Sequence, residues 1–532
     1  MYTTARSRLE SIYKKSSTRP LRGRMVGIEK ECLRVSGDGT LSTLDHPHQL
    51  GSALTHPSIT TDFSEALLEI VTPPFTDMSD TLDCLTETQK FVYSKLPEGE
   101  LLWATSMPCG LNVDCDVPIG RYGTSNIGHM KHVYRRGLGL RYGRKMQAIA
   151  GVHYNYSYPD TFWELMAEVE GEPSVSDEFI SSQYFALVRN ILRFGWLIPY
   201  LFGASPAVCG TFFGNNAPPE KMHKLGRNTL FEPYATSLRM GNIGYQNNRE
   251  ESASIDADYN SLKGYVDFLQ CAVTAKSERY EKLGLRDADN EYQQLNTNLL
   301  QIENEYYSAI RPKQITLPNE MPSIALAKRG VKYVELRSLD VNAYDPLGIN
   351  DEQLRFVESF MLFCMLCESP LITISEQAEI KSNLLAVAHR GRDPELKLRR
   401  AGKEIPLRQW GEEILDVVGE MCDLLDVEGK PKFYCNSLSQ QLAKIYEPNK
   451  TPSGMMLQEL QDNDEDFFPF GLRKSTEHRD WYQSSSLSDE AISRLEKRVE
   501  DSHAKQTEIE NSDTLSFEEF LQNYFSQVDK RS

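Results

Sequence analysis

Residues 26–35 limit the possible folds of this chain more than any other part of its sequence. Apolar residues alternate there with two carboxylates, as in a β-strand, where successive side chains point to opposite faces. Glu29 and Glu31 therefore share one face, and we expect Lys30, on the other face, to extend past its apolar neighbours to water. Two carboxylates on one face repel each other unless water, protons or a cation lies between them. Taken alone, this segment fits both a solvated sheet face and a ligand-binding face.

A second strand-like segment, residues 66–71, is apolar on both faces apart from Glu69. A carboxylate in such a strand is costly unless a partner or a cation neutralises it. Asp62 precedes this strand and is expected to join Glu69, whereas Glu65 is expected to cap or solvate the turn. The alternatives for Glu69 are an edge position that faces water and a protonated carboxyl.

A third and a fourth segment repeat this one-sided polarity. His153 and Asn155 share one face of a strand whose other face is rich in tyrosine. Glu335 and Arg337 share one face of the strand that is predicted over residues 331–339. A lone histidine is usually structural, and the Glu–Arg pair is equally compatible with a structural ion pair.

Four separated segments with polar, mostly oxygen-bearing side chains on one face indicate a sheet that lines a cleft. Carboxylates with one imidazole favour Mg²⁺ or Mn²⁺ over zinc as the bound metal. More than one such ion beside arginines is the arrangement that phosphoryl transfer requires. The sequence contains no G-x-x-x-x-G-K-[ST] phosphate-binding loop, and its glycine-rich run at 137–143 is predicted to be a plain loop.

The composition is that of an ordinary globular protein, with 532 residues of which 40% are hydrophobic and 25% charged. The formal net charge of -18 argues against a nucleic acid or an anionic membrane as a partner. No apolar run approaches the roughly 20 residues of a membrane span, and no apolar core follows the basic N-terminus as in a secretory signal. We therefore expect a cytoplasmic protein.

The ten cysteines are scattered along the chain, and we expect their thiols to be reduced. Cys364 and Cys367 form a C-x-x-C pair, but they lie in an apolar helical run without a second pair at zinc spacing. Core packing is therefore predicted for both.

Helical periodicity predicts several long helices, and a mostly helical chain from Asp351 onward. The long helices before that point are predicted over residues 78–95, 177–203 and 258–283. Pro199 and Gly203 are expected to end the second of them.

Two helices are predicted at the end of the chain. Ser488 is expected to cap the first, and Ser516 with Glu519 to form a capping box for the second. The apolar residues of this last helix include Phe520, Leu521 and Tyr524. We expect both helices to pack on the main body of the protein.

With these segments the chain resembles the bacterial glutamate–cysteine ligases of the gamma-proteobacterial type. Matching motifs include G-I-E-K-E at 27–31, S-M-P-C at 106–109 and E-L-R-S-L-D at 335–340. Further matching stretches are 51–56, 60–69, 122–126, 151–157, 194–206, 233–239 and 301–305. The resemblance is strong over roughly residues 20–370 and weaker in the helical remainder.

This resemblance implies an α+β fold related to glutamine synthetase, in which a curved, largely antiparallel sheet forms a funnel-shaped active site surrounded by helices. It implies that the chain, 1–532, is a single catalytic unit. A sheet-based core over about 20–370 then carries a mostly helical C-terminal region, about 371–532, packed on it. We expect a monomer.

The resemblance also implies the reaction. ATP phosphorylates the γ-carboxylate of glutamate, and the cysteine amine displaces phosphate to give γ-glutamylcysteine, the first step of glutathione biosynthesis. The protein is then an ADP-forming acid–amino-acid ligase whose partners are the small molecules glutamate, cysteine and ATP, with Mg²⁺ or Mn²⁺ as cofactor. The alternative within this class is a related ligase that joins glutamate to a different amine.

The resemblance assigns roles to individual side chains. Glu335 and Arg337 are expected to be catalytic, and Arg239 is expected to clamp a substrate carboxylate. The expected metal ligands are Glu29, Glu31, Asp62, Glu69, His153 and Glu335. The expected substrate-binding residues are Tyr134, Arg135, Asn155, Arg239, Tyr245 and Tyr307.

Two departures from the family pattern are visible. Lys30 replaces the arginine that the family carries between its two acids, with little expected effect because it faces away from the cleft. Residues 210–232 match poorly, which leaves the loops near the cysteine pocket in doubt. Outside the ligases, paired glutamates also serve glycoside hydrolysis, and a non-catalytic binding protein would have the same fold. The arginines beside the acids favour phosphate chemistry.

Overall fold

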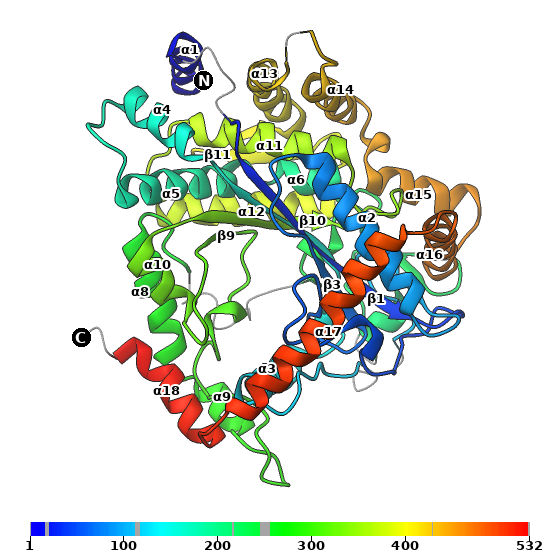
Figure 1. Ribbon diagram of the computed structural model, residues 1–532. Coiled ribbons are helices and arrows are strands. Elements are labelled where there is room, and N and C mark those ends of the chain that lie inside the picture. Colours follow the sequence, from blue (N-terminus) through cyan, green and yellow to red (C-terminus); the bar gives the residue numbers. More distant parts are fainter. Residues whose placement is uncertain are drawn as a thin grey trace.

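A computed structural model of the protein (Figure 1) has an antiparallel sheet at its centre, with helices packed around it. The structure describes residues 2–15, 21–111, 117–214, 217–244, 256–427 and 429–529. Among these residues, no helix is both long and apolar enough to cross a membrane.

Seven strands form the central sheet, and each of their pairings is antiparallel. The strand order is β2 (Ile59–Thr61), β3 (Leu67–Val71), β1 (Met25–Val35), β5 (Gly151–Ser157), β10 (Tyr333–Asp340) and β9 (Ile310–Lys313). The two-residue strand β4 (Leu101–Leu102) pairs with the end of β1. The predicted α+β class and antiparallel sheet are therefore confirmed, and the four segments with one polar face are strands β1, β3, β5 and β10.

The pairing register gives the sheet two chemically different faces. On one face, Ile28, Tyr154 and Leu336 lie opposite one another on the three central strands and are buried. The helices α2 (Met78–Lys95), α5 (Asp177–Phe194) and α6 (Leu197–Phe202) contact strands of the sheet, and α11 (Asp351–Leu366) packs on α2 and α5. The other face carries the polar residues and is left to line a cleft.

The remaining helices before α11 surround the sheet (Figure 1). They are α1 (Thr3–Lys15), α3 (Asn126–Tyr142), α4 (Asp160–Glu170), α8 (Leu262–Thr274), α9 (Glu278–Leu283) and α10 (Pro322–Arg329). The described residues also form two smaller sheets, one before α11 and one after it. They are β6 (Ala207–Cys209) with β8 (Thr229–Phe231) and β7 (His223–Leu225), and the hairpin of β11 (Lys397–Arg400) with β12 (Lys403–Pro406).

The chain from Asp351 onward is mostly helical, as predicted. After α11 it forms α12 (Ile374–Arg390), α13 (Leu407–Leu425), α14 (Phe433–Tyr446), α15 (Pro452–Asp462), α16 (Phe467–Gln483), α17 (Asp489–Ser512) and α18 (Phe517–Asp529). Ser488 caps α17 through the backbone N–H of Ala491, and the capping box of Ser516 and Glu519 begins α18. Both predicted caps are therefore confirmed.

The glycine-rich run at 137–143 is not a loop, so that prediction was wrong. It forms the last two turns of α3, which ends at Gly143 in a positive-φ conformation. A Cβ at Gly137 would lie 2.1 Å from the side-chain oxygen of Gln301, so the helix needs glycine there for close packing. Pro199 likewise does not end a helix: it lies in the first turn of α6, where proline is tolerated.

Lys30 faces away from the cleft, as predicted, but it does not reach water. Helix α2 covers this part of the sheet, and the Lys30 side chain is almost completely buried. Its Nζ donates hydrogen bonds to Oε1 of Gln89 on α2, at 2.7 Å, and to the carbonyl oxygen of Pro346, at 3.2 Å. Burial lowers the pKa of the Lys30 ammonium, and these two acceptors replace the water that we expected.

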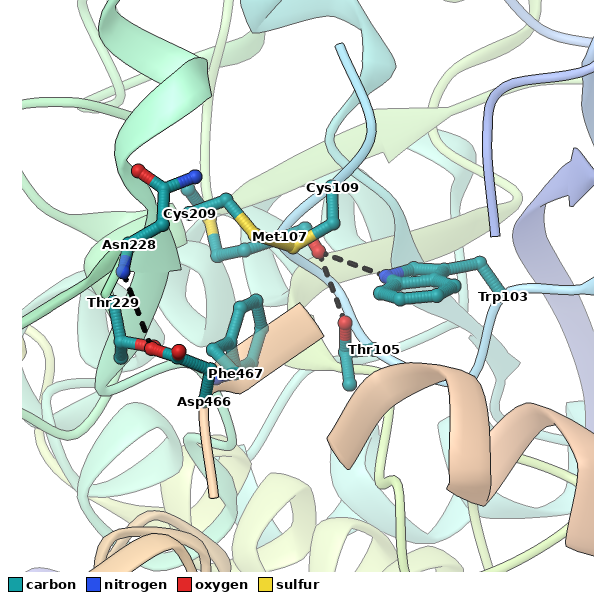
Figure 2. Close-up of a disulfide and its surroundings, with 9 residues drawn as sticks. All are labelled: Trp103, Thr105, Met107, Cys109, Cys209, Asn228, Thr229, Asp466 and Phe467. Carbon is teal, nitrogen blue, oxygen red and sulfur yellow. Dashed lines mark hydrogen bonds between the residues drawn. A yellow bond between two sulfur atoms is a disulfide. The ribbon is translucent and has the colours of Figure 1, made fainter. Parts of the chain in front are cut away.

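The expectation that all thiols are reduced was also wrong. Cys109, in the loop after β4, forms a disulfide with Cys209 at the end of β6, as Figure 2 shows. Within the loop of Cys109, Trp103 and Thr105 both donate hydrogen bonds to the carbonyl oxygen of Met107. The two cysteines are 100 residues apart, so their spacing in the sequence gives no sign of the contact. Cys364 and Cys367 are buried free thiols, in agreement with core packing.

Removing the disulfide should destabilise the folded protein. A double variant, Cys109→Ser with Cys209→Ser, should lose about 2–4 kcal/mol of unfolding free energy, because the disulfide closes a long loop in the unfolded chain. Guanidinium unfolding monitored by circular dichroism measures this loss. The matched control is Cys271→Ser, which replaces an exposed free thiol. Equal unfolding midpoints for the double variant and the wild type would contradict the prediction.

Candidate active site

A cleft of about 480 Å³ opens on the polar face of the sheet. Strands β1, β3, β5, β9 and β10 contribute to its floor, and helix α3 forms one of its walls. The predicted site residues that line it are Glu29, Glu31, Asp62, Glu69, Tyr134, Arg135, His153, Arg239, Tyr307, Glu335 and Arg337. Residues from separate segments of the sequence are thus brought together.

His153 lies at the centre of the acidic group. Its Nδ1 is 2.9 Å from Oε2 of Glu29 and 3.4 Å from Oε1 of Glu335, and its Nε2 is 3.5 Å from Oε1 of Glu31. The strand register explains this contact, because Glu29 on β1 lies directly opposite His153 on β5. On the other side of β1, Glu31 lies opposite Glu69 of β3.

The acids differ in how strongly they hold a proton. Burial raises the pKa of Glu69 well above its ordinary value, and repulsion from Glu29 and Asp62 raises it further. Burial also raises the pKa of Glu31, although His153 opposes this shift. Both carboxyls therefore favour a neutralising partner, which is either a proton or a bound cation.

Glu29 and Glu335 are held in the charged form. Burial alone would raise the pKa of Glu335, but Lys313 and Arg337 lower it well below its ordinary value. For Glu29, burial and the charge of Glu335 raise the pKa, but the contact with His153 and the charge of Lys313 act together against them, and the pKa is lowered.

The donor set fits a divalent cation. Ligand atoms of Glu29, Glu69 and His153 lie within 4.8 Å of one another. Hard oxygen ligands with one imidazole suit Mg²⁺ or Mn²⁺. Asn155 donates a hydrogen bond from Nδ2 to Oε1 of Glu29, at 2.9 Å, while its buried Oδ1 accepts none from the described residues. A polar oxygen buried in this way is expected to face a partner that the protein itself does not supply.

Positive side chains face the acids from β9 and β10. Arg337 donates a hydrogen bond from Nη1 to Oε1 of Glu335 at 2.7 Å, and Nζ of Lys313 is 3.1 Å from Oε2 of the same carboxylate. Arg311 lies directly opposite Glu335 in the β9–β10 register, and both Arg311 and Lys313 line the cleft. The acidic face is thus bordered by three cations.

Our sequence reasoning missed Arg311 and Lys313. Their spacing of two residues in a short extended run carries the same signal as Glu29 and Glu31. The intervening Pro312 hides this signal, because proline is usually confined to edge strands. In the structure, β9 is the last strand in the sheet order beside β10, a position where proline is tolerated.

Buried polar contacts beneath the cleft hold Arg239 in place. It lies in the short 3-10 helix η5 (Leu238–Met240), donates from Nη2 to the carbonyl oxygen of Arg337 at 2.8 Å, and has Nη1 3.6 Å from Oδ1 of Asp340. A Cβ at Gly151 would lie 2.0 Å from its Nη2, so glycine permits this close approach. The backbone N–H of Gly151 also donates to Oε2 of Glu31 at 2.6 Å.

Helix α3 brings Tyr134 and Arg135 to the wall of the cleft. The Arg135 guanidinium stacks over the ring of Tyr122, 4.5 Å from its centroid, and its Nε donates to the carbonyl oxygen of Asp62. Arg135 therefore ties the loop of Asp62 to this helix.

The other predicted substrate residues lie as follows. Tyr307 lines the cleft, and its hydroxyl is 3.2 Å from Sδ of Met240. Asn155 contacts Glu29 and thus touches the acidic group. Tyr245 lies outside the described residues, so its predicted role stays a prediction. Glu65 is buried rather than solvated, and it accepts hydrogen bonds from the backbone N–H groups of His46 and Arg121 in two other loops rather than capping its own turn, so its predicted role was wrong.

Comparison with known proteins gives a consistent result. A family model described as glutamate-cysteine ligase matches residues 9–387, more than half of the chain. A glutamate–cysteine ligase of Alcanivorax borkumensis is 44% identical over 522 residues, which are 97% of this chain and 98% of the relative. One from Pseudomonas aeruginosa is 46% identical over 502 residues, 94% of each chain.

Solved structures agree with these sequence relatives. The crystal structure of a glutamate–cysteine ligase from Francisella tularensis, in complex with AMP, matches with a TM-score of 0.89 at 35% identity, covering 95% of this chain and 98% of that one. A bifunctional glutathione synthetase from Pasteurella multocida shares the fold, with a TM-score of 0.70 at 24% identity over 90% of this chain and 55% of that one.

Replacing Glu69 by glutamine should raise the stability of the metal-free protein and weaken its stabilisation by a divalent cation. In metal-free buffer at about pH 8, Glu69→Gln should raise the thermal unfolding midpoint. A carboxyl whose pKa is raised by folding loses its stabilising effect as the pH rises through that raised value. With Mg²⁺ or Mn²⁺ at about 100 times its dissociation constant, the wild type should gain about 2.7 kcal/mol by linkage, and the variant much less.

Differential scanning fluorimetry with and without the ion measures both effects. Glu172→Gln, at an exposed surface position, is the matched control and should behave like the wild type. An undiminished response of Glu69→Gln to the ion would remove Glu69 from the cation site.

Proposed function

Because the chain belongs to the glutamate–cysteine ligase family, we propose that its cleft joins the amine of cysteine to the γ-carboxylate of glutamate, with ATP as co-substrate. The products are γ-glutamylcysteine, ADP and phosphate, and the reaction is the first step of glutathione biosynthesis. One observation carries the proposal: buried carboxylates around His153 face Arg311, Lys313 and Arg337 across a single cleft. The cationic side chains can bind a chain of phosphates, and the carboxylates can bind the divalent cations that accompany it.

More than one Mg²⁺ or Mn²⁺ ion would be held by Glu29, Glu31, Asp62, Glu69, His153 and Glu335. When bound, such ions would supply positive charge that offsets the negative charge developing on the phosphate during transfer. The raised pKa values of Glu31 and Glu69 support this assignment, because a cation replaces the proton that each carboxyl otherwise favours.

The cationic side chains would orient the two substrates that react first. Arg311 and Lys313 attract the triphosphate, and Arg337, held by Glu335 at 2.7 Å, lies where it can contact the transferring phosphoryl group. An oxygen of the glutamate γ-carboxylate attacks the γ-phosphorus, and ADP leaves. The cysteine amine then attacks the acyl carbon, phosphate leaves with the bonding electrons, and the proton that the nitrogen loses passes to the released phosphate.

Arg239 would clamp a carboxylate of an amino-acid substrate, since its planar guanidinium suits two parallel hydrogen bonds. Its Nη2 is already fixed by the carbonyl oxygen of Arg337, which orients the group within the cleft. Tyr134, Tyr307 and Tyr245 would surround the cysteine, and Arg135 and Asn155 would contact the glutamate side.

The remaining proposals concern the setting of the enzyme. The AMP bound to the Francisella tularensis relative supports a nucleotide site. We propose that the chain works as a single catalytic unit, because α18 packs directly on α3 of the site wall. We also propose that it works in the cytoplasm and as a monomer.

Product analysis tests the proposed function. Incubation of the purified protein with ATP, Mg²⁺, glutamate and a set of amines that includes cysteine should yield γ-glutamylcysteine by mass spectrometry. Phosphate release should require both amino acids. Preferred ligation of another amine would support the related ligase instead, and phosphate release without an amino acid would contradict the proposal.

The matched inactive variant is Glu335→Gln. It removes the charge that holds Arg337 and Lys313, and turnover should fall by about 100-fold or more, as for the loss of other transition-state electrostatic groups. An unchanged far-UV circular dichroism spectrum serves as the folding control. Wild-type turnover in this variant would remove Glu335 from the catalytic group.

Arg239→Ala should chiefly raise the KM for an amino-acid substrate. The loss of charge-assisted hydrogen bonds to a carboxylate predicts an increase of about 10- to 100-fold. Steady-state kinetics with each substrate varied in turn measures the effect, and Arg239→Lys, which keeps the charge without the planar fork, should give an intermediate value. An increase confined to the KM for ATP would show that the clamp is wrongly assigned.

A further inference from the structure

The last helix of the chain, α18, packs against the wall of the candidate active site. Phe520 and Leu521 of α18 form a buried apolar cluster with Met130 and Val133 of α3 and with Leu295. In Figure 1, α18 lies at the edge of the molecule close to α3 and α9. This segment follows residue 387, where the match to the family model ends.

The chain before α18 also holds the beginning of α3. Glu510 accepts a hydrogen bond from the backbone N–H of Thr124 at 2.8 Å, and Asp513 accepts one from the backbone N–H of Asn126. The side chain of Asn126 donates in turn to the carbonyl oxygen of Leu515 at 2.9 Å. These hydrogen bonds and the apolar cluster together fix the position of α18 relative to α3.

Tyr524 extends from α18 into the cleft, where it is one of the lining residues. It packs against the apolar cluster on α3 and also against the main core of the protein. Three residues later, Gln527 contacts the loop between β9 and α10: its Nε2 donates to the carbonyl oxygen of Asn319 at 2.9 Å, and its Oε1 accepts from the backbone N–H of Met321 at 3.2 Å. Asn319 also lines the cleft.

The part of the cleft around Tyr524 differs chemically from the part around His153. Its lining includes the apolar side chains of Ile127, Met130 and Ile302, which belong to the same apolar cluster as Tyr524. A triphosphate and the dicarboxylate glutamate are poorly suited to such a surface, because their charges would lose water without gaining partners, which leaves the cysteine side chain and the adenine ring of ATP as the two groups that could lie against it. A thiol side chain is suited to it, since sulfur makes favourable contacts with aromatic rings.

We propose that Tyr524 is a positioning residue for the cysteine substrate, with its ring forming part of the pocket wall that Tyr134 also lines. This inference rests on the proposed ligase function. Helix α18 holds the Tyr524 ring in place from one side through the cluster on α3 and from the other through Gln527. The C-terminal helix is thus part of the active site.

Four full-length variants test the proposal. Tyr524→Ala should raise the KM for cysteine about three- to tenfold, the value of one aromatic contact, with kcat and the KM for ATP within about twofold of the wild type. Tyr524→Phe keeps the ring and should restore the wild-type KM. Gln527→Ala should raise the KM for cysteine to a smaller extent, and Asn523→Ala, at an exposed position on the same helix, is the control.

The outcomes separate this inference from the proposed function. A wild-type protein that forms no γ-glutamylcysteine would overturn the proposed function itself. An active wild type with an unchanged KM for cysteine in Tyr524→Ala, or with equal increases in every KM, would overturn only the role of Tyr524. If Tyr524→Ala fails to fold, Tyr524→Leu keeps most of the apolar volume and should show the same selective increase in the KM for cysteine.

Discussion

The antiparallel pairing of β1 with β3 and β5 is the interaction on which the rest of the structure depends. It places Glu29 opposite His153 and Glu31 opposite Glu69, so that carboxylates from two strands gather beside the histidine of a third on one face. Such a face is unstable by itself, because buried like charges repel and lose their water. Lys313 and Arg337 offset part of this negative charge and lower the pKa of Glu335. The pKa values of Glu31 and Glu69 stay raised. The remaining deficit of positive charge is what a divalent cation can supply.

The opposite face of the sheet is held to its helices by buried polar contacts. Glu358 of α11 is fully buried beneath it, where it accepts hydrogen bonds from the hydroxyls of Tyr156 and Tyr434 and pairs with Arg24. Lys30 reaches Gln89 on α2 in the same way. A buried charged group held by such contacts is specific about geometry, because any shift leaves the charge unpaired. These contacts fix the helices behind the sheet, and through them the strands that carry the candidate site residues.

Much of the fold and of the site follows from local pattern. Period-two alternation identified β1, β3, β5 and β10 and the faces on which Glu29, Glu31, His153 and Glu335 lie, since a strand offers two faces and burial selects one. Period 3.6 identified α2 with its bounds. The failures have physical reasons as well. The glycine-rich run at 137–143 predicts a loop, yet it is helical in α3, where Gly137 is needed because Gln301 packs against it. In β9, Pro312 concealed the strand that carries Arg311 and Lys313.

The sequence by itself determined which side chains share a face, because that depends only on the alternation of neighbouring residues along an extended chain. Only the tertiary structure decided which faces meet: the register that aligns Glu31 with Glu69, the disulfide between Cys109 and Cys209, and the contact of α18 with α3. Each of these joins segments that are far apart in the chain, where local spacing carries no information about distance in space. Their positions follow from the packing of the whole molecule around one sheet.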